Sequence, residues 1–201
     1  MEAVIYILNT SLVKENYSFV LSYISKNRRE KAEKLINEKD RLLSIGGGYL
    51  LKKYLPSEEI KVSENGKPYL ENGPCFNLSH SEKYVVLAIH PSFDVGVDIE
   101  KINGNKVDAI KYTLSKEEKN ITDIDTLFQI WSNKESLIKC KSTGLKDIKN
   151  VNGLPLEGMR LLECEEYYSK SIVYDGYSLS ISLKTNNPVK IKIIPLESLE
   201  K

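Results

Sequence analysis

The sequence predicts an α+β fold in two halves. In each half, helical segments come before a group of short and mostly antiparallel strands, an order that is typical of the α+β class. The composition is that of a folded protein with a real core, because 41% of the 201 residues are apolar and 28% are charged. We place the boundary between a first half, 1–101, and a second half, 102–201.

The first half opens with an apolar run at 3–8 (AVIYIL) that predicts a strand. Helices are expected at 11–25 and 28–55. The second helix should break near Gly46-Gly47-Gly48, since glycine weakens a helix, and should end at Pro56. Short strands bounded by turn residues follow. They are expected at 60–62, 75–78, 84–89 and 93–99, with a polar loop over 77–81.

The second half repeats this order of elements. Ser115 and Glu118 have the spacing of a capping box, which predicts the start of a helix at 116–121. Tyr174-Asp175-Gly176-Tyr177 is expected to be the turn of a hairpin. Helices are expected at 105–113, 116–121 and 125–140, and strands at 159–164, 170–175, 177–183 and 189–194.

The charge and cysteine patterns exclude several classes of function. The formal net charge is +1, so no global field favours nucleic acid or an anionic membrane as partner. No run of about 18 apolar residues predicts a membrane span, and the first residues lack the basic and small-residue signals of a leader. The three cysteines are widely spaced and form no C-x-x-C pair, which argues against a disulfide framework or a zinc site. We therefore expect a cytoplasmic protein.

Asp98 and Glu100 come at the end of the apolar strand at 93–99. Because side chains alternate along a strand, both carboxylates should point to the same face, about 7 Å apart at Cα. Such a pair of hard oxygen ligands suits Mg²⁺, which often combines a few carboxylates with substrate phosphates and water. The simpler interpretation of an isolated D-x-E is a solvated strand end.

Glu135 and Lys139 lie one turn apart on the helix expected at 125–140. An exposed ion pair that stabilises the helix is the usual meaning of this spacing. Trp131 lies one turn earlier on the same face, and core packing is its default role. These residues alone do not predict an active site.

The polar segment 77–81 (NLSHS) holds His80, one of two histidines in the chain. Its side chains could cap backbone groups of a turn, or Ser79 and His80 could bind a phosphate. A serine hydrolase is disfavoured, since no G-x-S-x-G elbow occurs. Lys67 is presented by the turn Gly66-Lys67-Pro68.

The order of these clusters is more informative than any one of them. The motifs GKPY (66–69), FNLSHS (76–81), GVDIE (96–100), LSKEE (114–118) and WSNKESLIK (131–139) together resemble the 4'-phosphopantetheinyl transferase family of the Sfp type. Two of them match the family's core patterns G-[IV]-D-[IVL]-E and W-x-x-K-E-[AS]-x-x-K in full. The resemblance covers roughly residues 20–145, and the last 50 residues share only the pattern of strands.

The resemblance implies a pseudo-twofold pair of similar α+β halves in one chain, with the active site in the cleft between them. It implies that Asp98, Glu100 and Glu135 bind Mg²⁺ and that Lys139 lies near the pyrophosphate of coenzyme A. The remaining coenzyme contacts that it implies are made by Arg28, Lys31, Ser44, Lys67, Ser79 and His80. The contacts at the adenosine end are carried over less directly, because Leu43 and the triple glycine depart from the residues that many members have there.

The reaction that the resemblance implies is attack by a serine of an apo acyl or peptidyl carrier protein on the β-phosphate of coenzyme A, with adenosine 3',5'-bisphosphate leaving. Asp98, Glu135 and Lys139 would be the catalytic residues, and the serine proton would pass to Glu135 directly or through a metal-bound water. Two alternatives stay open: a magnesium-dependent pyrophosphate hydrolase and a non-catalytic carrier-binding module. A pseudo-dimeric chain is expected to act as a monomer, and the sequence does not specify which fatty-acid, polyketide or peptide carrier it modifies.

Overall fold

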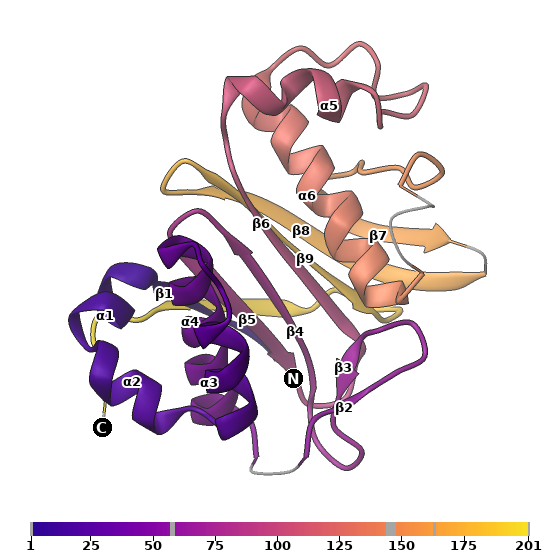
Figure 1. The fold of residues 1–201 in the computed structure, drawn as a ribbon. Coiled ribbons are helices and arrows are strands. Elements are labelled where there is room, and N and C mark those ends of the chain that lie inside the picture. The colour runs from indigo at the N-terminus through magenta and orange to yellow at the C-terminus, as the bar shows by residue number, and fades with distance from the viewer. Residues whose placement is uncertain (1, 57–58, 144–147, 163, 201) are drawn as a thin grey trace.

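The computed structural model describes residues 2–56, 59–143, 148–162 and 164–200. Two four-stranded sheets, a two-stranded ribbon and six α-helices make up this part of the chain (Figure 1). The helical elements are α1 (Thr10–Glu15), α2 (Tyr17–Tyr23), α3 (Lys26–Glu33), α4 (Glu38–Tyr54), the 3₁₀ turn η1 (Gly104–Lys106), α5 (Val107–Lys111) and α6 (Ile124–Lys141). The strands are β1 (Glu2–Asn9), β2 (Lys61–Val62), β3 (Pro68–Tyr69), β4 (Cys75–Ser81), β5 (Tyr84–His90), β6 (Val95–Lys101), β7 (Glu157–Leu162), β8 (Glu165–Tyr174), β9 (Tyr177–Lys184) and β10 (Lys190–Pro195).

The first sheet has the strand order β10-β1-β5-β4. Strand β10 runs parallel to β1, and the other neighbours are antiparallel. One face of this sheet is covered by α1–α4 (Figure 1). The core beneath these helices includes Phe76, Val85 and Leu87 from the strands and Ile45 and Leu50 from α4, all nearly inaccessible to solvent.

The second sheet has the order β6-β9-β8-β7 and is antiparallel throughout. Helix α6 lies across one face of it (Figure 1). Strand β9 shows why both faces are buried: Leu179 and Ile181 point to one face, while Ser178, Ser180 and Ser182 point to the other, toward α6. The hairpin turn predicted at 174–177 is confirmed, with Asp175 and Gly176 both at positive φ.

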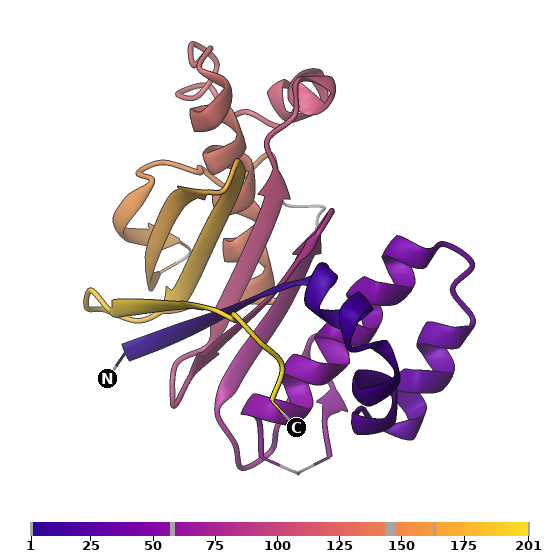
Figure 2. The same cartoon turned by 90° about the vertical axis from the view of Figure 1, so that its left-hand side faces the viewer.

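The two sheets share an apolar core on the faces that their helices leave uncovered. Ile5 and Val86 of the first sheet belong to the same buried cluster as Val97 and Ile181 of the second. The helices therefore lie on the outer sides of the two sheets, as the turned view in Figure 2 shows. This arrangement confirms the predicted α+β class, while the twofold relation between the halves stays a prediction.

Two strands cross the boundary that we predicted at residue 101. Strand β6 precedes it but pairs with β9 in the second sheet, and β10 follows it but pairs with β1 in the first. The division into halves stays a prediction, and each half exchanges one strand with the other. The described residues include no helix that is long and apolar enough to cross a membrane.

The helix predicted at 28–55 is broken at a different place from the one expected. Helix α4 continues through the three glycines, and the interruption falls between α3 and Asn37 instead. Asn37 begins the new helix, because its Oδ1 accepts the backbone N–H of Lys39 at 2.8 Å. The glycines are buried, and a Cβ at Gly46 would lie 3.3 Å from Leu8 Cδ2, so packing outweighs the low helix propensity of glycine here.

Candidate functional site

The segment 77–81 forms the second part of strand β4, so the predicted loop is wrong. Strand β4 is the edge of the first sheet and meets β6, the edge of the second, through side chains instead of a backbone ladder. Since the polar residues recur every second position, they all face β6. The side-chain oxygens of Asn77, Ser79 and Ser81 accept hydrogen bonds from the backbone N–H groups of Val97, Ile99 and Lys101, at 3.0, 3.3 and 3.1 Å. We call this row of contacts the polar seam.

Small residues let α6 lie directly on the second sheet. A Cβ at Gly96 of β6 would lie 2.0 Å from the backbone oxygen of Ser136 and 2.4 Å from the backbone nitrogen of Cys140. Only glycine fits at this position, which explains the glycine in the GVDIE motif. Under the same helix, buried serine hydroxyls of α6, β8 and β9 bond one another at 2.6–2.8 Å. This close approach brings the α6 side chains over Asp98 and Glu100.

Asp98 is the centre of the site. Its Oδ1 accepts a hydrogen bond from Ser79 Oγ at 2.9 Å and an ion-pair contact from Lys139 Nζ at 2.7 Å. Lys139 Nζ also lies 3.2 Å from Ser79 Oγ. The side chain of Asp98 is only 6% exposed. The structure therefore brings together three residues that the sequence analysis placed in different motifs.

Glu100 lies next along the same face of β6. Its Oε2 accepts Lys106 Nζ at 2.9 Å and Ser81 Oγ at 3.3 Å. The predicted same-face pair of carboxylates is thus present, and each acid contacts one lysine from a helical element. An isolated solvated strand end does not describe this arrangement, because Asp98 is buried.

Glu135 of α6 faces both of these acids. Burial, followed by the charge of Asp98, raises the pKa of Glu135 from 4.5 to about 7, with a further contribution from Glu100. Lys139 opposes this rise in pKa. Glu135 and Lys139 are consequently part of the acidic site and not an isolated exposed pair on the helix.

The acids have the chemistry of a magnesium site. Asp98 Oδ2 is buried and accepts no hydrogen bond from the residues that the structure describes, so one carboxylate oxygen is left for a cation. Within those residues, however, no three His, Cys, Asp or Glu side chains are grouped so that they could hold an ion by themselves. Mg²⁺ commonly completes its shell with substrate phosphates and water, so the residues present fit the ion in the presence of a phosphate ligand. The three-carboxylate assignment stays a prediction.

Lys67 lies at the end of α6. Its Nζ donates to the backbone carbonyl of Cys140 at 3.0 Å and lies 3.8 Å from Asp94 Oδ1. A lysine at this position satisfies a carbonyl of the last helical turn and interacts favourably with the helix dipole. The phosphate contact of Lys67 stays a prediction.

A cavity of about 750 Å³ lies between α3, α4 and the β2–β3 ribbon. Its volume is in the range of small-molecule sites. Arg28 and Lys31 line it, as expected for residues that bind one ligand, and burial lowers the pKa of the Arg28 guanidinium. The rest of the lining is mainly apolar, with Leu51, Leu55, Ile60, Val62, Pro68 and Leu78 among its residues. The cavity therefore combines a cationic side with an apolar wall.

Ser44 and His80 lie at the border of this cavity. Ser44 is one helical turn before Gly48, a lining residue of α4. His80 is exposed and lies two residues after Leu78 on β4, so it points to the same face of the strand as that lining residue. Neither is among the residues that line the cavity itself. Ser79 points the other way, to Asp98, so strand β4 separates the cavity side from the acidic side.

Two residues near these sites, Lys52 and Ser81, were not predicted from the sequence. Lys52 lines the same cavity as Arg28 and Lys31. It lies about two helical turns after Ser44 on α4, and this spacing could have indicated that both residues lie near one face of the helix. Ser81 contacts Glu100. The pattern N-x-S-x-S at 77–81 has the two-residue period of a strand, and this period could have predicted the polar seam.

The predicted capping box has a different role in the structure. Glu118 Oε2 accepts the backbone N–H of Ser115 at 2.6 Å, but residues 116–120 form turns and no helix. Glu118 is fully buried and pairs with Lys134 Nζ of α6 at 2.6 Å, which is also fully buried. The buried ion pair with Lys134 holds Glu118 in place of a helix cap, and it fixes the segment before α6. Trp131 packs against apolar clusters on both sides of α6, as its default interpretation predicts.

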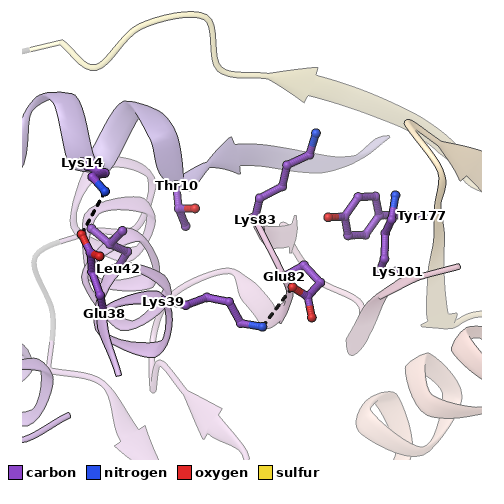
Figure 3. Close-up of a pocket in the computed structure, with 9 residues that line it drawn as sticks. All are labelled: Thr10, Lys14, Glu38, Lys39, Leu42, Glu82, Lys83, Lys101 and Tyr177. Atoms are coloured by element: carbon purple, nitrogen blue, oxygen red, sulfur yellow. Dashed lines mark ion pairs between the residues drawn. The ribbon is translucent and has the colours of Figure 1, made fainter. Parts of the chain in front are cut away.

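A second cavity, of about 450 Å³, lies at the opposite end of α4 (Figure 3). It contains none of the predicted site residues. Lys14 pairs with Glu38 at 3.1 Å, Lys39 with Glu82 at 3.0 Å, and Lys83 with Asp175 at 2.8 Å. Most of its positive charge is thereby balanced within the protein.

Comparisons with known proteins point to one family. The sequence profile of the 4'-phosphopantetheinyl transferase superfamily matches residues 94–179, which include β6, α6 and β8 and end shortly after the start of β9. The chain is 32% identical over 146 residues to 4'-phosphopantetheinyl transferase gsp of Aneurinibacillus migulanus, an alignment that covers 64% of this chain and 60% of the relative. It is 32% identical over 151 residues to 4'-phosphopantetheinyl transferase Sfp of Bacillus subtilis strain 168, with 66% of each chain covered.

A longer alignment extends the similarity to the ends of the chain. The 4'-phosphopantetheinyl transferase ffp of Bacillus subtilis is 27% identical over 96% of this chain and 96% of its own length. The two alignments at 32% identity span slightly less than two thirds of the relatives concerned.

Proposed function

We propose that this chain is a member of the 4'-phosphopantetheinyl transferase superfamily and moves the 4'-phosphopantetheine group of coenzyme A onto a serine of an apo acyl or peptidyl carrier protein. The observation that supports this most directly is the meeting of Glu135 and Lys139 of α6 with Asp98 and Glu100 of β6. The two patterns come from distant parts of the sequence, and a lysine of one contacts an acid of the other, since Lys139 Nζ lies 2.7 Å from Asp98 Oδ1.

Coenzyme A is proposed to bind on the first half. Arg28 and Lys31, assisted by Ser44, would hold its 3'-phosphate at the cationic side of the 750 Å³ cavity, and Lys52 adds a further positive charge there. The apolar wall fits the adenine ring. His80 at the border of the cavity and Lys67 at the end of α6 would hold the phosphates between this cavity and the acidic site.

Asp98, Glu100 and Glu135 are proposed to hold Mg²⁺ together with the pyrophosphate. When bound, the ion neutralises charge that develops on the phosphates. Asp98 supplies its free Oδ2, and Ser79 keeps the carboxylate oriented through Oδ1. Lys139 would stabilise the negative charge of the leaving phosphate, a contribution that a preorganised cation makes best in a partly buried site.

The transfer step forms a bond between the serine oxygen and the β-phosphorus and breaks the bond from that phosphorus to the oxygen bridging it to the α-phosphate. Adenosine 3',5'-bisphosphate leaves with the electron pair. Glu135 is the proposed acceptor of the serine proton, because a carboxylate positioned at the reacting hydroxyl can act as a general base. A metal-bound water is the alternative acceptor.

The proposal is tested by incubating the protein with coenzyme A, Mg²⁺ and a panel of apo carrier proteins, and then weighing each carrier by intact mass spectrometry. We expect at least one carrier to gain one phosphopantetheine group, and Asp98→Ala or excess chelator to abolish the gain. Release of adenosine 3',5'-bisphosphate from coenzyme A alone would favour the hydrolase instead. Coenzyme binding with no change in any carrier would favour a binding module.

We also propose that the protein works as a monomer in the cytoplasm, with coenzyme held by the first half and α6 supplied by the second. Three observations support this arrangement. Residues from both parts of the chain form the acidic site within one copy, both sheets are covered by helices of the same chain, and Cys75, Cys140 and Cys164 are free thiols, as is usual in a reducing compartment.

A further inference from the structure

We propose that Ser81 is a positioning residue that orients the Glu100 carboxylate for a divalent cation. This inference rests on the proposed function, because it takes Glu100 as part of the metal site. Ser81 contacts no proposed substrate group. It acts through Glu100.

The polar seam has two kinds of members. Asn77 only joins the two sheets, since its Oδ1 accepts the N–H of Val97, an apolar residue. Ser81 accepts the N–H of Lys101 and in addition offers its hydroxyl hydrogen to Glu100 Oε2. A serine hydroxyl can do both at once, because it has one donor and two acceptor positions.

Ser79 shows the same arrangement one step earlier along the seam. Its Oγ accepts the N–H of Ile99 and donates to Asp98 Oδ1. The backbone of β6 thus fixes each serine oxygen, and each serine hydroxyl in turn points at the acid beside it. Both serines are buried, at 6% and 9% exposure, so water competes little for these contacts.

Glu100 needs such a support more than Asp98 does. Its side chain is 21% exposed, compared with 6% for Asp98, and its other partner is Lys106 of η1, whose side chain is 53% exposed. A solvated lysine restrains a carboxylate weakly. The Ser81 contact, although at 3.3 Å, comes from a buried strand residue with a fixed backbone. Without the Ser81 contact, only the solvent-exposed ammonium group of Lys106 would restrain the Glu100 carboxylate.

The test is a titration with Mn²⁺ in the presence of a fixed concentration of coenzyme A, in which the electron paramagnetic resonance signal of the free ion reports binding and coenzyme A without protein is the blank. Wild type is compared with Ser81→Ala, Ser81→Thr, Asn77→Ala and Asp98→Ala. We expect Ser81→Ala to weaken Mn²⁺ binding by about tenfold, the lower end of the effect of losing a group that orients a metal ligand. Ser81→Thr, which keeps the hydroxyl, should bind close to wild type. Asn77→Ala should lower Tm but leave Mn²⁺ affinity unchanged.

A kinetic measurement complements the titration. In Ser81→Ala, the Mg²⁺ concentration for half-maximal carrier modification should rise by about tenfold, while kcat at saturating Mg²⁺ changes little. If Ser81→Ala does not fold, Ser81→Cys replaces it, because a thiol fills the same place with a much weaker hydrogen bond.

The outcomes separate this inference from the proposed function. Wild-type affinity in Ser81→Ala, or an equal loss in Asn77→Ala, overturns the role of Ser81 and leaves the metal site standing. Equal Mn²⁺ binding by wild type and Asp98→Ala overturns the metal site itself, and the role of Ser81 with it.

Discussion

Glu135→Gln should make the metal-free protein more stable at alkaline pH. In the folded protein the pKa of Glu135 is raised from 4.5 to about 7, chiefly by burial and by the charge of Asp98. Between these two values the folded state keeps a proton that the unfolded state has lost. The free energy of unfolding therefore falls as pH rises from about 4.5 and levels off above about 7.

The size of this effect follows from the shift in pKa. A shift from 4.5 to about 7 corresponds to at most about 3 kcal/mol. Glu135 is half-buried, so solvent screens part of the interaction, and we expect about 1–2 kcal/mol. Glutamine has the same shape and does not titrate. Relative to wild type, Glu135→Gln should gain this amount between pH 5 and pH 8.

Urea denaturation at pH 5, 6, 7 and 8, with chelator and without coenzyme A, measures this gain. Glu33→Gln is the matched control, because Glu33 is exposed at the end of α3 and its replacement changes the net charge equally. Parallel stability curves for wild type and Glu135→Gln over this range would refute the reasoning, since they would mean that Glu135 is not held near the other acids. Adding Mg²⁺ with coenzyme A at pH 8 should stabilise wild type more than Glu135→Gln.

Three further predictions concern other parts of the structure. Gly96→Ala should lower the free energy of unfolding by about 1–3 kcal/mol in urea denaturation, because the added Cβ collides with the α6 backbone. The displaced helix should also slow transfer about 10²-fold, and a stable and active variant would contradict the close approach of α6 to β6. Lys134→Met should cost about 3–5 kcal/mol by leaving the Glu118 carboxylate buried and unpaired, and adding Glu118→Gln should recover part of this loss in a double-mutant cycle. Arg28→Ala should raise KM for coenzyme A but leave KM for 3'-dephospho-coenzyme A nearly unchanged, and an equal rise for both would place the 3'-phosphate elsewhere.

Most of the fold could be predicted from local patterns. The strands β1, β5, β9 and β10 coincide closely with the expected ranges, because they are either short apolar runs or alternate apolar with polar residues. Strand β8 begins five residues before its expected start at 170. The errors occur where contacts from distant parts of the chain decide the outcome. The glycines of α4 are helical because side chains of neighbouring strands and helices pack directly against them. Residues 77–81 extend β4 because their backbone pairs with β5, and the side chains of Asn77, Ser79 and Ser81 also bond to N–H groups of β6.

The candidate site could be predicted only in part from the residues themselves. Spacing predicted that Asp98 and Glu100 share a face, but it could not predict that α6 would lie over them. That contact depends on Gly96 and on serine hydroxyls that are far apart in the sequence. The resemblance to a family supplied this link. For Ser81 and Lys52, spacing indicates which face of the strand or helix they lie on, but the contact itself depends on a neighbour from another element.

The pairing of β10 with β1 has a consequence for how the protein is made. Among the described elements, β1 is synthesised first and β10 last, yet they are neighbours in one sheet, with Ile5 opposite Ile193. The growing chain therefore carries β1 with one unpaired edge until residues 190–195 have been added. Contacts between such distant positions form slowly, and open strand edges invite association between chains. During synthesis, the sheet that carries α3 and α4 is thus completed later than the other sheet and is more exposed to misassembly.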